Sequence, residues 1–208
     1  MTKDSEQISK KLPWNRCRFT GPKPPLKPKQ IWGIRTRLQI AKRTRDMALF
    51  DLALDSKLRG CDLVRVKISD IAVHGAVQTR ATVTQRKTGR PVQFELTEQT
   101  RISVQGWLQI RGNRSPEFLF PSRICRSGHL STRQYARLVD EWTSLIGLDP
   151  KAYGTHSLRR TKAALIYKRT GNLRAVQLLL GHTKLESTDR YLGVEVDDAL
   201  IISEQTEI

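Results

Sequence analysis

Residues 154–191 read GTHSLRRTKAALIYKRTGNLRAVQLLLGHTKLESTDRY, and this stretch decides both the fold and the chemistry of the chain. His156 and Arg159 are three residues apart, so a helix would place their side chains on one face. Thr155 is a suitable N-cap for that helix, and Gly171 is expected to end it. The pattern therefore predicts a helix that presents a histidine and an arginine together.

A second helix is expected directly after the first one. Asn172 can cap it, residues 173–180 place apolar side chains on one side, and Gly181 is expected to end it. His182 then stands at the break that follows this helix. Tyr191 comes nine residues later, after a polar segment that suits a turn or a short helix.

Arginine, histidine and tyrosine together suit phosphoryl transfer without a metal. Fixed cationic donors stabilise the negative charge that develops on the phosphate oxygens. The planar fork of arginine matches phosphate geometry, and a tyrosine hydroxyl can act as a covalent nucleophile. No carboxylate cluster that could hold Mg²⁺ stands near this stretch of sequence.

The composition points to a nucleic-acid partner. The 208 residues carry a formal net charge of +17 and a pI of about 10.4, which favours binding to a polyanion. The chain has three cysteines without paired spacing, which indicates reduced thiols in a cytosolic protein instead of a disulfide framework or a zinc site. No apolar run reaches the length of a membrane-spanning helix.

HSLR, LLGH and the following tyrosine together resemble the C-terminal signature of the tyrosine recombinases, also called the phage-integrase family. In that family an HxxR pair, an LGH histidine and a tyrosine nine residues later form the active site. The resemblance implies that His156, Arg159, His182 and Tyr191 are catalytic. Three rival nucleophiles lack the family spacing to the LGH histidine: Tyr135, Tyr153 and Tyr167.

The segment SKLRGCDLVRVKISDI, residues 56–71, resembles the part of the family that delivers the first catalytic arginine. Arg59 matches that arginine, and Asp62 matches the acidic residue that supports the site. The family often has glycine before the Leu-Arg pair, whereas this chain has Lys57. The resemblance thus adds Arg59 as a catalytic residue and Asp62 as a supporting one.

Alternating β-branched residues predict three strands, at residues 64–68, 76–84 and 91–96. The segment QRKTGRP, residues 85–91, is expected to form a hairpin turn at Gly89. In the family, a lysine on this hairpin reaches the scissile phosphate. Lys87 is the best match, and Arg86 and Arg90 are its neighbouring alternatives.

The remaining segments predict an α+β fold: a mainly helical catalytic domain with a small antiparallel three-stranded sheet. Further helices are expected in residues 31–58, in residues 98–110 after a cap at Thr97, and behind a capping box of Ser131 and Gln134. The domain is expected to span residues 31–193 and to carry a net charge of +16. It lies between a basic, proline-rich arm (1–30, net +6) and an acidic tail or docking helix (194–208, net −5).

The resemblance implies a reaction in which the Tyr191 hydroxyl attacks a DNA phosphate, forming a 3′-phosphotyrosyl link and releasing a 5′-hydroxyl. Arg59 and Arg159 would bind the non-bridging oxygens, and His182 would donate a further hydrogen bond. Lys87 would protonate the leaving oxygen. No metal or other cofactor is needed, because the released hydroxyl can reverse the step.

His156 is expected to accept the tyrosine proton or to organise the nucleophile. The expected partners are double-stranded DNA with recombination sites and further copies of the chain, as a tetramer on two duplexes. Two alternatives are a type IB topoisomerase, which would relax supercoils as a monomer, and a non-catalytic DNA-binding regulator. Most relatives carry an N-terminal domain that closes around DNA, so this chain resembles the catalytic-domain-only recombinases that invert fimbrial promoters, or a truncated integrase gene.

Overall fold

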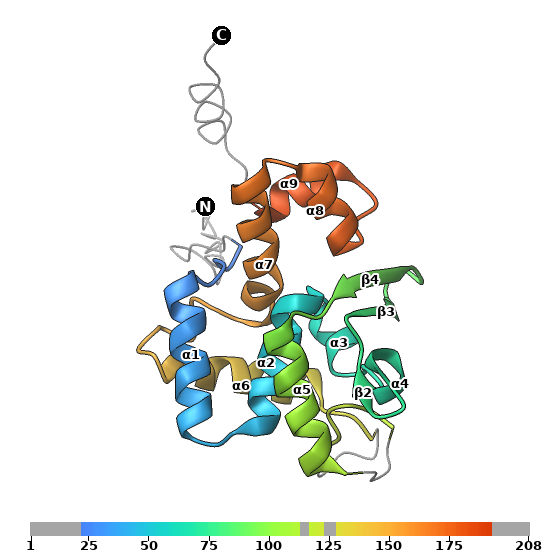
Figure 1. Ribbon diagram of the computed structural model, residues 1–208. Coiled ribbons are helices and arrows are strands. Elements are labelled where there is room, and N and C mark those ends of the chain that lie inside the picture. Colours follow the sequence, from blue (N-terminus) through green and yellow to red (C-terminus); the bar gives the residue numbers. More distant parts are fainter. Residues whose placement is uncertain (1–21, 113–116, 123–127, 193–208) are drawn as a thin grey trace, which may run out of the picture.

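The computed structural model describes residues 22–112, 117–122 and 128–192. The expected tail at residues 194–208 lies outside these residues, as does most of the expected arm. The helices of the described chain, shown in Figure 1, are α1 (Pro28–Ile40), α2 (Thr44–Ser56), α3 (Gly60–Leu63), α4 (Ile68–Ile71), α5 (Glu98–Arg111), α6 (Thr132–Ser144), α7 (Thr155–Thr170), α8 (Leu173–Leu180) and α9 (Leu185–Leu192). The strands are β1 (Ala72–Val73), β2 (Ala76–Val77), β3 (Arg80–Thr84) and β4 (Pro91–Glu95). None of the described helices combines the length and the apolar character that crossing a bilayer requires.

Helix α2 lies at the centre of the fold. It packs against α1, α5, α7 and β4, which enclose its apolar side chains (Figure 1). Leu49 and Leu52 are fully buried, and the Phe50 ring meets Trp142 of α6 edge-on, with 5.6 Å between ring centroids. Burying each such side chain stabilises the fold by about 1.5–3 kcal/mol. The end of α2 leads directly to Arg59, so this core fixes the start of the site.

The segment that precedes α1 also packs on the folded domain. Leu26 is buried, and its backbone N–H donates a hydrogen bond to Thr161 Oγ1 of α7 at 2.9 Å. The carbonyl oxygen of Lys23 accepts a hydrogen bond from Nη1 of Arg160 at 2.7 Å. Residues 23–30, which the sequence assigns to a basic arm, are therefore anchored to α7 or belong to α1.

The strands form two antiparallel pairs, β1 with β2 and β3 with β4, instead of one three-stranded sheet. The prediction of a strand at residues 64–68 is wrong. Val64 and Val66 follow the turn of α3, and Ile68 begins α4. Both valines are buried there, so core packing outweighs β propensity. The strand expected at residues 76–84 is divided into β2 and β3, because the chain changes its pairing partner between them. The mainly helical α+β class is confirmed.

Strands β3 and β4 form the hairpin that the sequence predicts. Their side chains alternate between core and solvent, as a half-buried sheet requires, with four of them buried: Ala81, Val83, Val92 and Phe94. The backbone N–H of Gln85 donates to the carbonyl of Arg90 at 2.8 Å and closes the turn. Gly89 takes the left-handed conformation there, with φ of 64°.

Helix α7 begins one residue earlier than a cap at Thr155 would require. Gly154 is the N-cap, with an extended backbone, and its N–H donates to the hydroxyl of Ser157 at 3.2 Å. Thr155 is already the first helical residue, so the predicted cap at Thr155 is wrong by one position. The shift leaves His156 and Arg159 on the first turns of the helix, as predicted.

The predicted ends of α7 and α8 are confirmed. Gly171 and Gly181 adopt left-handed conformations after these helices, with φ of 62° and 65°. The side chain of Asn172 accepts a hydrogen bond from the backbone N–H of Ala175 at 2.9 Å and so caps α8. Helices α7, α8 and α9 pack together around a small second core that is formed by Ala163, Val176 and Leu180 and touched by Tyr191.

Candidate active site

Arg159 stands at the centre of the predicted site. It is 3% exposed, and its Nη2 donates a hydrogen bond at 2.8 Å to the carbonyl oxygen of Leu180, the last residue of α8. The same nitrogen lies 3.4 Å from Nε2 of His182. The guanidinium carbon Cζ is 5.6 Å from the centroid of the Tyr191 ring. Burial lowers the pKa of Arg159, but a guanidinium remains charged in proteins, so the site holds a buried cation.

Arg59 reaches the same site from the start of α3. It is the N-cap residue of α3, and its Nη1 donates to Oε1 of Gln85 at 2.6 Å. Nε2 of Gln85 donates in turn to the carbonyl of Leu180 at 3.2 Å. Because Arg159 uses that same carbonyl, the two arginines are joined through one buried amide and one peptide oxygen.

His182 follows α8 and lies between Arg159 and α9. Its Nδ1 is 3.1 Å from Oγ1 of Thr188, and its ring meets the Tyr191 ring edge-on with 5.4 Å between centroids. Burial, Arg159 and Arg59 lower the pKa of His182 from 6.5 to about 4. The imidazole is therefore neutral at pH 7, with Nε2 accepting from Arg159 and Nδ1–H donating to Thr188.

Tyr191 lies on α9 and is half-buried. Arg160 stacks over its ring with Cζ 4.7 Å from the centroid, while Arg159 approaches from a second direction. Burial raises the pKa of the Tyr191 hydroxyl, and the three nearby arginines only partly offset this effect. The hydroxyl is therefore protonated at pH 7, and a proton acceptor would be needed to make it a nucleophile.

His156 meets the tyrosine through its backbone. The Tyr191 hydroxyl donates to the carbonyl oxygen of His156 at 3.5 Å, at the long limit of a hydrogen bond. Burial and the positive charges of Arg159, Arg160 and Arg59 lower the pKa of the His156 imidazole. A neutral imidazole is the form of histidine that can accept a proton.

The comparison with known families settles the membership of this chain. The sequence model described as "Phage integrase family" matches residues 26–197. The chain belongs to the phage integrase family. It is 29% identical over 151 residues to "Tyrosine recombinase XerC" of Erythrobacter litoralis, a match that covers 73% of this chain and 47% of the relative. It is 27% identical to "Probable integrase/recombinase YoeC" of Bacillus subtilis, covering 75% of this chain and 81% of that protein.

Solved structures show the same fold. The XerA recombinase superposes with a TM-score of 0.72 at 20% identity, covering 87% of this chain and 64% of that one. The Tn1549 transposon integrase in complex with transposon right end DNA gives 0.71 at 18% identity, covering 90% and 67%. The chain spans about half the length of most of the curated relatives it matches, with 47% of one XerC and 52% of a XerD from Rickettsia conorii.

The other site residues expected from the family are Asp62, on α3, and Lys87, on the turn between β3 and β4. Asp62 is buried, and its Oδ1 accepts a hydrogen bond from the backbone N–H of Arg86 at 3.0 Å. The carboxylate thus anchors the start of the turn. Lys87 is exposed on the same turn, and among the described residues the structure records no contact between Lys87 and Arg59, Arg159 or the tyrosine. Five of the six predicted catalytic residues are therefore brought together, and Lys87 is not.

Two residues of this candidate site were not assigned from sequence. Gln85 joins the arginines, but it is separated from its partners by 26 and 95 positions, so no local pattern marks it. Arg160 stacks on Tyr191, although its place directly after the HxxR arginine could have drawn attention to it. Both residues are buried polar side chains, a feature that becomes visible only in three dimensions.

The rival tyrosines occupy other surroundings. Tyr135 is buried against Trp142 in the main core, where burial raises its pKa far above the ordinary value. The hydroxyl of Tyr153 accepts a hydrogen bond from Gln30 of α1 at 3.3 Å. Tyr167 packs against the second core. Tyr191 is thus the tyrosine that lies beside the arginines of the site.

Proposed function

We propose that this chain is a site-specific DNA recombinase that cuts and rejoins DNA strands through a 3′-phosphotyrosyl intermediate. The observation that carries the proposal is the position of Tyr191 beside the guanidiniums of Arg159 and Arg160, at 5.6 and 4.7 Å from its ring. Cations fixed beside a tyrosine can stabilise the negative charge that develops when it attacks a phosphodiester. The proteins similar to this chain include tyrosine recombinases and an integrase in complex with transposon DNA, which supports the proposal.

In the proposed step the Tyr191 oxygen forms a bond to phosphorus, and the bond from phosphorus to the 5′ oxygen breaks. The tyrosine proton passes to a base, for which His156 is the candidate, and Lys87 gives a proton to the 5′ oxygen. Arg59 and Arg159 bind the non-bridging oxygens. These side chains supply all the groups of the reaction, and the energy of the phosphodiester is kept in the phosphotyrosyl bond.

Phosphate binding changes the role of His182. In the structure, without DNA, the Nε2 atom of His182 faces a hydrogen-bond donor, the Nη2 of Arg159, at 3.4 Å. A phosphate oxygen would take over that arginine hydrogen and would itself accept a hydrogen bond from His182. The imidazole must then carry a proton on Nε2, so we expect DNA to raise the pKa of His182 from its value of about 4 in the free protein.

The proposed partner is double-stranded DNA, bound by the catalytic domain at residues 31–193, with four protomers on two duplexes during strand exchange. The part of the expected arm that precedes residue 23 is proposed to act as a basic arm on DNA. Residues 194–208 are proposed to act as an acidic segment that docks on a neighbouring protomer. The net charge of +16 on residues 31–193 supports the DNA partner. Log affinity should fall with log salt by about 0.9 for each neutralised phosphate.

The decisive experiment is capture of the covalent intermediate. Nicked duplexes tiled across the DNA that flanks the gene are incubated with wild-type protein and with Tyr191→Phe, and adducts are resolved in SDS. Wild type should form an adduct at defined positions, and Tyr191→Phe should bind the same DNA without forming one. An adduct with the phenylalanine variant would exclude Tyr191 as nucleophile. Relaxation of supercoiled DNA by monomers, without paired sites, would favour the topoisomerase alternative.

A further inference from the structure

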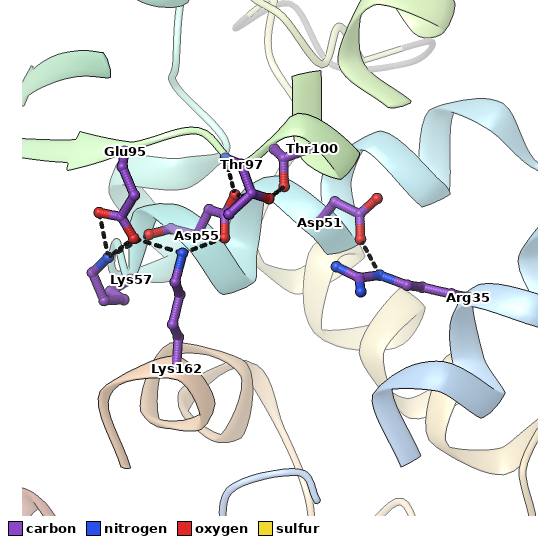
Figure 2. Close-up of polar contacts among 8 residues, drawn as sticks. All are labelled: Arg35, Asp51, Asp55, Lys57, Glu95, Thr97, Thr100 and Lys162. Carbon is purple, nitrogen blue, oxygen red and sulfur yellow. Dashed lines mark hydrogen bonds and ion pairs between the residues drawn. The ribbon is translucent and has the colours of Figure 1, made fainter. Parts of the chain in front are cut away.

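A second charged cluster lies next to the site, and the reaction proposed above does not use it. Figure 2 shows two lysines and two carboxylates from three different elements in mutual contact. Lys162 Nζ lies 2.6 Å from Oδ1 of Asp55 and 2.5 Å from Oε1 of Glu95. Lys57 Nζ lies 3.2 Å from the same Glu95 oxygen and donates to the carbonyl of Asp55 at 2.6 Å. One carboxylate thus bridges both ammonium groups.

Lys57 is held in this cluster against two unfavourable conditions. Its side chain is 0% exposed, so its ammonium is removed from water. Its backbone is left-handed, with φ of 53°, a conformation that favours glycine, the residue that the family often has here. Burial lowers the pKa of Lys57, while the negative charge of Glu95 opposes that shift. A lysine persists at such a position only where its partners compensate for the burial.

The cluster joins the elements that carry the catalytic arginines. Lys57 is two residues before Arg59, and Lys162 is on α7, three residues after Arg159 and therefore on a related face. Glu95 belongs to β4, which pairs with the strand leading to Gln85. The elements that carry the two arginines are thus joined by this cluster as well as by Gln85.

Asp55 connects the cluster to α5 as well. Its Oδ2 accepts hydrogen bonds from the backbone N–H and the hydroxyl of Thr97, at 2.8 and 2.7 Å, at the N-cap position of α5 (Figure 2). Its Oδ1 holds Lys162. One buried carboxylate therefore fixes the start of α5 and the face of α7 at the same time.

We propose that Lys57 and Lys162 are positioning residues, which hold Arg59 and Arg159 in register for the scissile phosphate by sharing the carboxylates of Asp55 and Glu95. The inference rests on the proposed recombinase function. The pairing also explains how lysine replaces glycine before the Leu-Arg pair: the ammonium of Lys57 has Glu95 and the Asp55 carbonyl as partners. The four formal charges sum to zero, so the cluster leaves the positive charge of the site unchanged.

The test is the rate of phosphotyrosyl adduct formation at saturating nicked DNA, measured beside DNA affinity and thermal unfolding. Lys162→Met should lower that rate by about 10- to 100-fold with little change in affinity, because small displacements of catalytic groups cost rate. Lys162→Arg should restore most of the rate, since it keeps the cation between Asp55 and Glu95. Lys168→Met, an exposed lysine on the same helix, is the control and should cleave at the wild-type rate.

Lys57→Gly is the second variant, for the case that Lys162→Met does not fold. Glycine adopts the left-handed conformation without strain, and the substitution removes the ammonium group. It should also cleave slowly, and its defect should not add to that of Glu95→Gln. Wild-type rates in folded Lys162→Met or Lys57→Gly protein would overturn the inference while leaving the recombinase proposal intact. Absence of any adduct with wild-type protein would instead count against the recombinase proposal.

Discussion

Replacing Gly181 by alanine should destabilise the protein by about 2–5 kcal/mol. Gly181 has φ of 65°, and a side chain in that conformation costs about 1–2 kcal/mol. A Cβ atom there would also lie 2.6 Å from Cγ2 of Val92 and 3.0 Å from Nε2 of Gln85. One of these neighbours must then move, and overpacking of this kind costs about 1–3 kcal/mol more.

Gly147→Ala is the matched control, because Gly147 has φ of 74° and nothing within 4 Å of an added Cβ. It should lose only about 1–2 kcal/mol in urea unfolding followed by circular dichroism. Since Gln85 supports Arg59, folded Gly181→Ala should also form the covalent adduct slowly, whereas Gly147→Ala should cleave normally. Equal losses of stability in the two variants would refute the argument that Gly181 is required for close packing between α8 and β4.

Replacing Gln85 by leucine removes the link between Arg59 and the α8 carbonyl, so adduct formation should slow by about 10-fold or more at saturating DNA, with little change in affinity. Arg160→Met should slow the same reaction by about 2- to 30-fold, the range expected for loss of a cation over the Tyr191 ring. The pKa of His182 is lowered from 6.5 to about 4, so the unfolded chain takes up a proton between these values that the folded chain does not. Stability should therefore fall as pH drops through this window, and His182→Asn should lessen the fall in urea titrations. Lys87→Ala should cleave ordinary DNA about 10²- to 10⁴-fold more slowly and recover on DNA with a 5′-bridging sulfur, which leaves without a proton; equal defects on both substrates would assign Lys87 another role.

The helices that carry the site could be predicted from sequence because local chemistry fixes their ends. Gly171 and Gly181 are needed for left-handed backbone, and Asn172 supplies an oxygen that the first turn of α8 requires. These effects act within a few residues. The order of His156, Arg159, His182 and Tyr191 along the chain is therefore enough to indicate a common site.

The parts that sequence did not predict depend on partners that are distant in the chain. Val64 and Val66 have the alternating pattern of a strand, yet they are buried in the core from the turns that follow α3. Burial of their side chains, and not their backbone preference, decides their conformation. Gln85 and Lys57 have no distinctive local pattern. Their roles come from hydrogen bonds across 95 and 38 positions, respectively.

In the free protein, Arg59 and Arg159 donate to neutral oxygen atoms, the amide of Gln85 and the carbonyl of Leu180, instead of to carboxylates. A neutral dipole orients a guanidinium without cancelling its charge, so the two arginines keep their positive charge and their mutual repulsion. An arriving phosphate would replace these neutral acceptors of the described site and relieve that repulsion as it binds. The contacts that order the arginines therefore also leave them ready to exchange a neutral acceptor for a negatively charged phosphate oxygen, which accepts a stronger hydrogen bond.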